Sequence, residues 1–136
     1  MTALTYPEIE AATGRIADRI RRVVVARGNP DLVPTGDGGG SCEVYLALEF
    51  MQHTGTFKAR GALNFVRAQG EAGCLPDIGV TIASGGNAGL ACAWAARDQG
   101  VPSTVFVPAT APPVKVLRLG TSHRYRGVED VRPGTF

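Results

Sequence analysis

Residues 79–108 read GVTIASGGNAGLACAWAARDQGVPSTVFVP, and this stretch decides the fold. A short apolar run at 79–83 leads through a turn with two glycines into an alanine-rich segment at 88–99. A second apolar run at 103–107 follows and stops at Pro108. Strand, helix and strand in this order form a βαβ unit, so we expect two parallel strands joined by a right-handed crossover.

The sequence after this unit predicts one more helix and then an irregular end. Residues 110–113, Thr-Ala-Pro-Pro, place an N-cap residue and two prolines where a first helical turn begins. With that helix, residues 79–120 form a βαβα unit, and the predicted fold class is α/β with a three-layer parallel sheet. Residues 121–136 show neither the helical nor the strand period and are expected to form an irregular tail.

The sequence before the unit predicts two helices and a strand. Thr5-Tyr6-Pro7-Glu8 has the form of a capping box, and apolar residues at helical spacing extend the helix from about Pro7 to Arg22. The segment 28–41 is rich in glycine and proline and is expected to be a loop, whereas Glu43 to Glu49 alternates as a strand does. A second helix is expected from about Thr56 to Gln69. The residues expected to face inward on it are Ala62, Leu63, Phe65 and Val66.

Composition narrows the class of protein. Apolar residues make up 44% and charged residues 19% of the 136 residues, which is typical of a soluble globular domain. No stretch approaches the roughly 20 apolar residues of a membrane helix, and the N-terminus lacks a secretory signal, so we expect a cytoplasmic protein without a membrane partner. A net charge of +2 gives no reason to expect a nucleic-acid partner. Because Cys42, Cys74 and Cys92 are isolated, neither a metal site nor a disulfide framework is expected.

Lys58 is the first candidate for chemistry. The chain has 14 cationic residues, of which only Lys58 and Lys115 are lysines. A turn containing Gly55 delivers Lys58 to the first turn of the predicted helix, where the positive end of the helix dipole disfavours an ammonium group. A neutral amine there is a nucleophile for an aldehyde. The alternative is a surface lysine that extends into water, and its position alone does not separate the two.

The turn Ser84-Gly85-Gly86-Asn87 is the second candidate. It joins a strand to a helix, and such a turn directs backbone N–H groups and the positive helix end at one point, which suits a phosphate or a carboxylate. The pattern is neither G-x-G-x-x-G nor a Walker loop, so it gives little support to a nucleotide. The alternative is an ordinary tight turn in which Asn87 is the helix N-cap.

Three motifs in order resemble one enzyme family. TGTFKARGA at 54–62, ASGGNA at 83–88 and VFVPATAPPVK at 105–115 together resemble the threonine/serine dehydratase branch of the fold-type-II pyridoxal-phosphate enzymes. The resemblance covers roughly residues 6–120. It implies a fold of the tryptophan-synthase-β kind and pyridoxal 5'-phosphate as cofactor.

The resemblance also implies roles for single residues. Lys58 would form the Schiff base with the cofactor and later act as the base on the substrate α-carbon. Phe57 would pack near the cofactor ring, and Asn87 would hydrogen-bond its 3′-oxygen. The turn of Ser84, Gly85, Gly86 and Asn87 would receive the substrate carboxylate. Lys115 has no counterpart with a catalytic role and is interpreted as a solvated helix lysine.

Some positions depart from the family's pattern. Gly85 stands where related serine racemases have a second serine, whose hydroxyl serves the opposite face of the cofactor, so Gly85 argues against racemisation. Ala88 replaces a frequent histidine. The family's members are about twice this length or more, and the loop for the cofactor phosphate has no counterpart in residues 120–136. We therefore expect residues 1–120 to be a partial enzyme domain, truncated relative to the family, in which 79–120 belongs to its smaller domain.

The function that the resemblance implies is deamination of L-threonine or L-serine to a 2-oxo acid, by elimination of water and release of ammonia. We expect little or no turnover from this chain by itself. Two alternatives stay open: an inactive product of truncation or frameshift, and a small α/β module that binds anions without catalysis. The expected partner is a small amino acid, and a homo-oligomer also stays open because the family's members are commonly dimers or tetramers.

Overall fold

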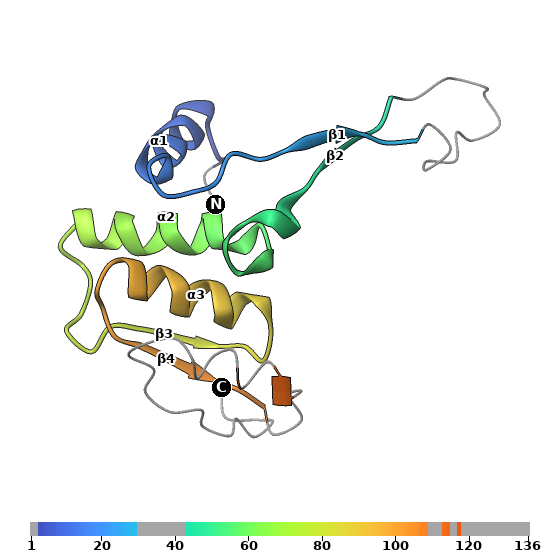
Figure 1. The fold of residues 1–136 in the computed structure, drawn as a ribbon. Helices are drawn as coiled ribbons and strands as arrows, with labels where there is room; N and C mark the ends of the chain where they lie inside the picture. The colour runs from blue at the N-terminus through green and yellow to red at the C-terminus, as the bar shows by residue number, and fades with distance from the viewer. Residues whose placement is uncertain (1–2, 30–42, 109–112, 115–116, 118–136) are drawn as a thin grey trace.

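In a computed structural model of the chain, residues 3–29, 43–108, 113–114 and 117 are described. Three helices and four short strands follow one another in two groups, an N-terminal helix with a ribbon and a C-terminal α/β unit (Figure 1). The elements are α1 Tyr6–Ile16, β1 Val25–Arg27, β2 Tyr45–Ala47, η2 Glu49–Met51, η3 His53–Gly55, α2 Lys58–Glu71, β3 Val80–Ala83, α3 Asn87–Asp98 and β4 Ser103–Phe106.

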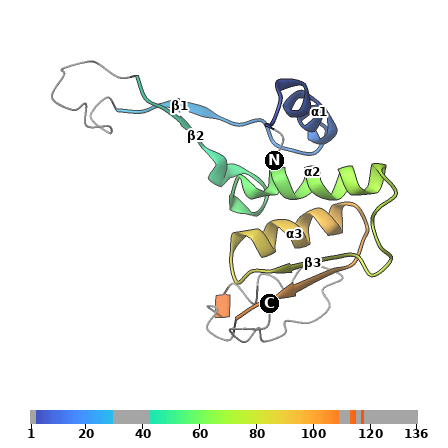
Figure 2. The ribbon, with the colours of Figure 1, turned by 180° about the vertical axis from the view of Figure 1, so that it is seen from behind.

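The β3–α3–β4 unit confirms the predicted βαβ arrangement. β3 and β4 pair in parallel, in a register that runs from Val80 opposite Ser103 to Ala83 opposite Phe106. α3, α2 and α1 are stacked in that order above one face of this sheet (Figures 1 and 2). Of the helix expected from Thr110, residues 113–114 and 117 are described and are helical, whereas the tail 121–136 lies outside the described residues.

The first helix begins as predicted and ends early. The backbone N–H of Thr5 donates to the carboxylate of Glu8 at 2.7 Å, as in a capping box. α1 ends at Ile16, six residues before the predicted end at Arg22. The helical ladder stops because the peptide groups of Arg21 bond to the side chain of Gln52 instead. Apolar spacing alone did not indicate this competing partner.

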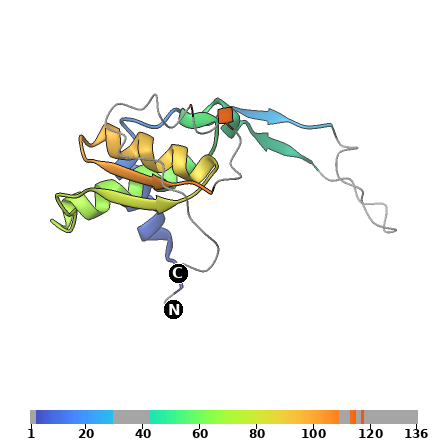
Figure 3. The same cartoon turned by 90° about the horizontal axis from the view of Figure 1, so that it is seen from below.

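A two-stranded ribbon follows α1 and precedes α2 in the sequence, and only its second strand was predicted. β1 pairs antiparallel with β2, with Val25 opposite Ala47. β1 was missed, although the run Val23-Val24-Val25 has the β-branched side chains that favour a strand. The strand predicted at Glu43–Glu49 is shortened to Tyr45–Ala47 because the chain bends into η2 at Glu49. The ribbon extends away from the helices (Figure 3), and most of the loop predicted at 28–41 lies outside the described residues.

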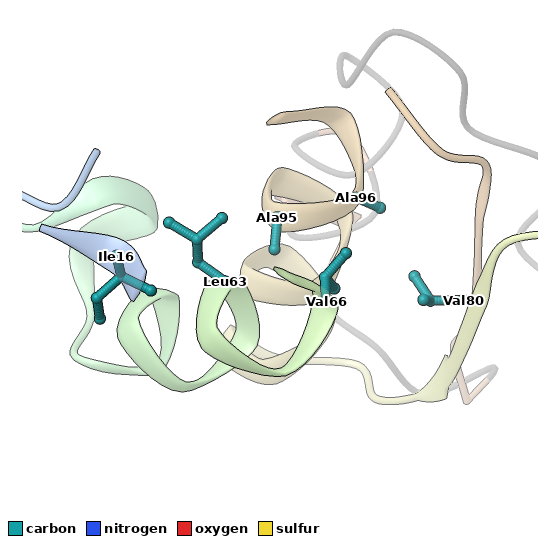
Figure 4. Packing of buried hydrophobic residues seen from close by; sticks show 6 residues of the cluster. All are labelled: Ile16, Leu63, Val66, Val80, Ala95 and Ala96. Carbon is teal, nitrogen blue, oxygen red and sulfur yellow. The ribbon is translucent and has the colours of Figure 1, made fainter. Parts of the chain in front are cut away.

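The hydrophobic core joins the helices to the sheet. One cluster brings together residues of α1, α2, β3 and α3, and Figure 4 shows side chains of α2 and α3 meeting inside it. Its buried members are Ile16, Leu63, Val66, Val80, Ala95 and Ala96. A second cluster packs α3 on β4 through Leu90, Ala93, Val105 and Val107.

The inward face of α2 differs from the prediction at one aromatic residue. Leu63 and Val66 are fully buried, as expected, but Phe65 is 58% exposed and Ala62 is half-buried. The buried stripe of α2 runs through Ala59, Leu63 and Val66, a spacing of four and three residues, and this places Phe65 on a different side of the helix.

No helix in the described part of the chain is long and apolar enough to span a membrane. Among the same residues, no group of three or more histidine, cysteine, aspartate or glutamate side chains is arranged to hold a metal ion.

Candidate functional site

The two predicted sites meet at one end of the molecule. α2 begins at Lys58 and α3 begins at Asn87. Both helices run in the same direction, so that their N-termini lie at the end where β3 and β4 finish (Figures 1 and 2). In open α/β sheets this carboxyl edge of the strands is where ligands bind. Two motifs 29 residues apart in sequence are therefore brought to the same edge.

A pocket of about 370 Å³ opens between α2, β3 and α3. Its volume falls within the range of about 300–1,000 Å³ that is usual for small-molecule sites. The walls are largely apolar, and Lys58 is the one cationic side chain among the described residues that line it. They comprise Phe57, Lys58, Gly61, Ala62, Phe65 and Val66 from α2 and its N-cap, Val80, Thr81 and Ile82 from β3, and Ala88, Ala91 and Cys92 from α3.

Lys58 is an exposed residue in the wall of this pocket, and Phe57 beside it is 61% exposed. The N-cap of α2 is Phe57, whose side chain accepts no hydrogen bond, and the first turn of the helix contains no acidic residue. Lys58 is therefore the first residue of a helix whose first turn contains no carboxylate to pair with its amine. Its role as the residue that binds the cofactor stays a prediction.

The turn before α3 is built to leave backbone N–H groups available. Its N-cap is Gly86, and no side chain caps the helix, so the alternative in which Asn87 is the N-cap is wrong. Asn87 is instead the first helical residue and is exposed. The Gly86 N–H donates to the Ser84 hydroxyl oxygen at 3.3 Å, which folds the turn onto itself. The N–H groups of the first helical turn have no partners within the helix, so they remain suited to a carboxylate or a phosphate.

The structure thus places the predicted residues in two adjoining parts. Lys58 and Phe57 lie in the pocket wall, whereas Ser84, Gly85, Gly86 and Asn87 form the neighbouring turn at the same edge and do not line the pocket. Ala88, the residue after Asn87, joins the two parts because it is in the first turn of α3 and in the pocket wall.

Sequence reasoning missed the residues that hold Lys58 in place. The segment before α2 contains Thr54 and Gly55 in succession in the left-handed region, with φ of +64° and +73°. Gln52 is 5% exposed and hydrogen-bonds backbone groups on both sides of it, and His53 stacks on Trp94 of α3. Local periodicity contained no signal for the bonds of Gln52 to Arg21 or for the stack of His53 on Trp94, because both join distant parts of the chain.

Cys92 is the other side chain of the pocket with its own reactivity. Burial raises the pKa of its thiol above the usual value of 9.0, so the thiol stays protonated at neutral pH. Because the thiolate is the nucleophilic form, Cys92 does not compete with an amine for an aldehyde. The pocket therefore combines one amine with apolar walls and an anion-binding helix end. These features fit an aromatic aldehyde together with a negatively charged group, which belongs either to the aldehyde or to a second bound molecule.

Comparisons with known proteins point the same way. Residues 9–121 match the family model described as "Pyridoxal-phosphate dependent enzyme". The chain is 38% identical over 114 residues to L-threonine ammonia-lyase of Geobacter sulfurreducens, which covers 84% of this chain and 27% of that protein. It is 42% identical over 76 residues to human L-serine dehydratase/L-threonine deaminase, which covers 56% of this chain and 22% of that protein.

The fold comparison adds a related activity. Maize serine racemase superposes with a TM-score of 0.79 at 27% identity, over 97% of this chain and 38% of the racemase chain. The neighbours are fold-type-II pyridoxal-phosphate enzymes, which confirms the predicted fold class and cofactor. The chain spans about a quarter of the length of the curated relatives that it matches.

Proposed function

Because the chain belongs to the family of pyridoxal-phosphate dependent enzymes, we propose that it carries the lysine-bearing part of a lyase that removes ammonia from L-threonine or L-serine. The observation that carries this proposal is the position of Lys58. Its amine lies at the N-terminus of α2, in the wall of an apolar pocket, beside the uncapped N-terminus of α3. An amine, an apolar surface and an anion site are the groups that this cofactor and an amino-acid substrate need.

In this proposal, Lys58 would hold the cofactor covalently through its side-chain nitrogen and would later take the proton from the substrate α-carbon. Phe57 would lie beside the cofactor ring, and the Asn87 side chain would donate a hydrogen bond to its 3′-oxygen. When bound, the cofactor supplies an electron sink that stabilises negative charge on the substrate α-carbon. The protein's part is to hold the ring, the lysine and the substrate in one geometry.

The turn before α3 would hold the substrate. Its four residues, Ser84 to Asn87, present backbone N–H groups and a positive helix end to the substrate carboxylate. With the carboxylate fixed there, the α-carbon lies toward the pocket edge that Lys58 shares. Loss of the β-hydroxyl as water would leave an enamine, whose imine form takes up a water molecule and hydrolyses to a 2-oxo acid and ammonia.

Amino-acid racemisation is the second candidate. It is favoured by the similarity to maize serine racemase, whose TM-score of 0.79 is higher than the 0.68 of a threonine deaminase. Racemisation needs a proton donor on each face of the α-carbon. Gly85 has no side chain to serve as the second donor at the position where a hydroxyl is expected, and this favours the lyase.

The binding part of the proposal can be tested on the chain itself. Purified chain is titrated with pyridoxal 5'-phosphate, and the absorbance of lysine-bound cofactor is followed in wild type, Lys58→Ala and Lys115→Ala. We expect the band in wild type and Lys115→Ala and its loss in Lys58→Ala. A folded wild-type chain that develops no band would contradict the proposal.

This chain matches 27% of the length of L-threonine ammonia-lyase. We propose that residues 1–120 are a partial enzyme domain, that 79–120 belong to its smaller domain, and that the chain alone turns over little substrate. A chimera that places this chain in the matched part of the Geobacter sulfurreducens protein is expected to release a 2-oxo acid from L-threonine or L-serine. Formation of D-serine without 2-oxo acid would instead support racemisation.

The setting of the protein is also proposed. We place it in the cytoplasm, because Cys74 and Cys92 are free thiols and a reducing compartment keeps them so. The proposed partner is a small amino acid. Whether the chain forms a homo-oligomer can be measured by sedimentation of the chain with cofactor.

A further inference from the structure

We propose that Gln52 is a positioning residue for Lys58, acting through the turn that leads into α2. This inference rests on the proposed role of Lys58 and adds a residue that neither the motifs nor the comparisons assign. Gln52 is six residues before Lys58 and does not line the pocket, so any effect on the lysine must pass through the backbone between them.

The Gln52 amide makes three hydrogen bonds to the backbone. Its nitrogen donates to the Arg21 carbonyl oxygen at 2.9 Å. Its oxygen accepts from the Arg21 N–H at 3.2 Å and from the His53 N–H at 3.0 Å. The side chain is 5% exposed, so water cannot readily replace these bonds. Gln52 therefore fastens the start of the turn to the chain segment that follows α1.

Two arginines, Arg21 and Arg60, make further hydrogen bonds between this turn and the segment that follows α1. The Arg21 guanidinium donates to the Met51 carbonyl oxygen at 2.7 Å. Arg60, two residues after Lys58, donates to the Arg21 carbonyl oxygen at 3.2 Å and pairs with Glu49 at 2.8 Å. The Arg21 carbonyl oxygen thus accepts hydrogen bonds from two side chains, Gln52, which precedes Lys58 in the sequence, and Arg60, which follows it.

The turn between these two attachments would be costly to hold without them. Thr54 is a β-branched residue with φ of +64°, a conformation that L-residues other than glycine seldom adopt. Phe57, the N-cap of α2, makes no side-chain cap bond that would fix the first helical turn locally. The local side-chain bond at this point is long, since the Thr56 hydroxyl oxygen accepts from the Lys58 N–H at 3.5 Å. The direction in which Lys58 leaves the backbone therefore depends mainly on the bonds of Gln52 and Arg60.

The test uses the fact that the chain has two lysines, Lys58 and Lys115. Wild type, Gln52→Ala and the matched control Gln69→Ala are checked for folding by circular dichroism. They are then labelled by reductive methylation with formaldehyde, and the ratio of labelling at Lys58 to labelling at Lys115 is read by mass spectrometry. Attachment of pyridoxal 5'-phosphate is measured separately, by borohydride reduction and peptide mapping.

We expect Gln52→Ala to shift the labelling ratio about threefold and to weaken cofactor attachment at Lys58 about tenfold, because small losses of orientation are expensive in such sites. Gln69→Ala, a change in the last turns of α2, should leave both measurements at the wild-type level. A role of Gln52 in stability alone would leave the labelling ratio and the attachment unchanged in folded protein, and that result would overturn the inference.

A second variant covers failure of Gln52→Ala to fold. Gln52→Glu keeps both acceptor bonds and removes the donated bond to the Arg21 carbonyl oxygen, so it should show a smaller shift in the same direction. A folded Gln52→Glu with the wild-type ratio and attachment would count against the inference. If wild type itself attaches no cofactor at Lys58, the proposed function fails, and this outcome is distinct from both of the others.

Discussion

His53 stacks on Trp94, with ring centroids 4.7 Å apart and ring planes inclined by 15°. The contact joins the turn before Lys58 to the middle of α3, and the Nε2 atom of His53 also lies 3.1 Å from the Arg19 carbonyl oxygen. His53 thus helps to hold the N-terminal end of α2 against α3 and against the segment after α1, together with the hydrogen bonds of Gln52 and Arg60 to Arg21. The two halves of the candidate site thereby keep a fixed relation.

Removing the stack should cost stability. His53→Ala is expected to lower the free energy of unfolding by about 1 kcal/mol, because an aromatic pair contributes that much beyond its buried area. His53→Phe retains the stack and loses only the contact with Arg19, so its loss should be smaller. Urea unfolding followed by the fluorescence of Trp94, the sole tryptophan, measures both. Equal losses in the two variants would show that the stack contributes nothing.

Gly89 should not tolerate a methyl group. A Cβ atom there would lie 2.7 Å from the Ser84 carbonyl oxygen and 2.9 Å from Cγ1 of Val105, because α3 packs closely on the sheet. Gly89→Ala is therefore expected to lower the free energy of unfolding by about 1–3 kcal/mol, despite the better helix propensity of alanine.

Gly14 provides the matched control in α1, since a Cβ atom there would meet nothing within 4 Å. Gly14→Ala should raise the free energy of unfolding by up to about 1 kcal/mol. Thermal unfolding of both variants is the measurement. A stabilising Gly89→Ala would contradict the packing described for α3 and the sheet.

Asp98 should make stability depend on acidity. Burial opposes its ionisation, but hydrogen bonds from Arg19 and Gln99 and the charges of Arg19 and Arg67 outweigh burial and hold its pKa below the usual 3.8. A depressed carboxyl pKa stabilises the fold above the pKa of the unfolded chain, and this stability is lost as the pH falls through the folded-state value. We therefore expect the urea concentration at the unfolding midpoint to decrease as the pH is lowered below about 4.

The matched variant for this dependence is Asp98→Asn, which cannot ionise. Its urea midpoint at neutral pH should be lower than that of wild type, and the fall below pH 4 should be shallower. Asp18, which is held below its usual pKa by the Arg67 guanidinium, retains its own contribution in the variant. If the urea midpoint decreased equally below pH 4 in wild type and in Asp98→Asn, Asp98 would not be a source of the pH dependence.

Thr54 should be replaceable with a gain in stability. Its left-handed conformation places the Cβ atom in an unfavourable position, and its buried hydroxyl oxygen finds no hydrogen-bond partner among the described residues. Thr54→Gly removes both costs and should raise the free energy of unfolding by about 1 kcal/mol. Gly55→Ala, which introduces a side chain at φ of +73°, should lower it by a similar amount. Unfolding in guanidinium chloride measures the free energy of unfolding of both variants. A lower value for Thr54→Gly than for wild type would mean that the threonine is not strained.

The sequence predicted best where the structure depends on neighbours in the chain. The β3–α3–β4 unit follows from the apolar runs, the glycines of the turn and the helix-favouring alanines between Asn87 and Asp98, all of which act locally. The capping box at Thr5 is equally local. The sequence alone did not bring Lys58 to the turn before α3, because β2, the strand before Lys58, pairs with β1 and not with β3 or β4.

The errors arise where distant residues compete with local preference. α1 ends at Ile16 because Gln52 takes the peptide groups of Arg21, a pairing across 31 residues that no periodic pattern contains. β1 exists because β2 pairs with it, so its three residues could not be assigned from their own sequence. Phe65 was assigned to the core because it is aromatic, yet the stripe set by Leu63 and Val66 decides which side of α2 is buried.

Attachment of the cofactor to Lys58 can be measured directly. The chain is reduced with borohydride in the presence of pyridoxal 5'-phosphate and digested, and the peptides that contain Lys58 and Lys115 are identified by mass spectrometry. We expect one equivalent of cofactor on Lys58 and only background on Lys115, with no fixed cofactor in Lys58→Ala. Equal modification of both lysines, or attachment to Lys115 alone, would contradict it.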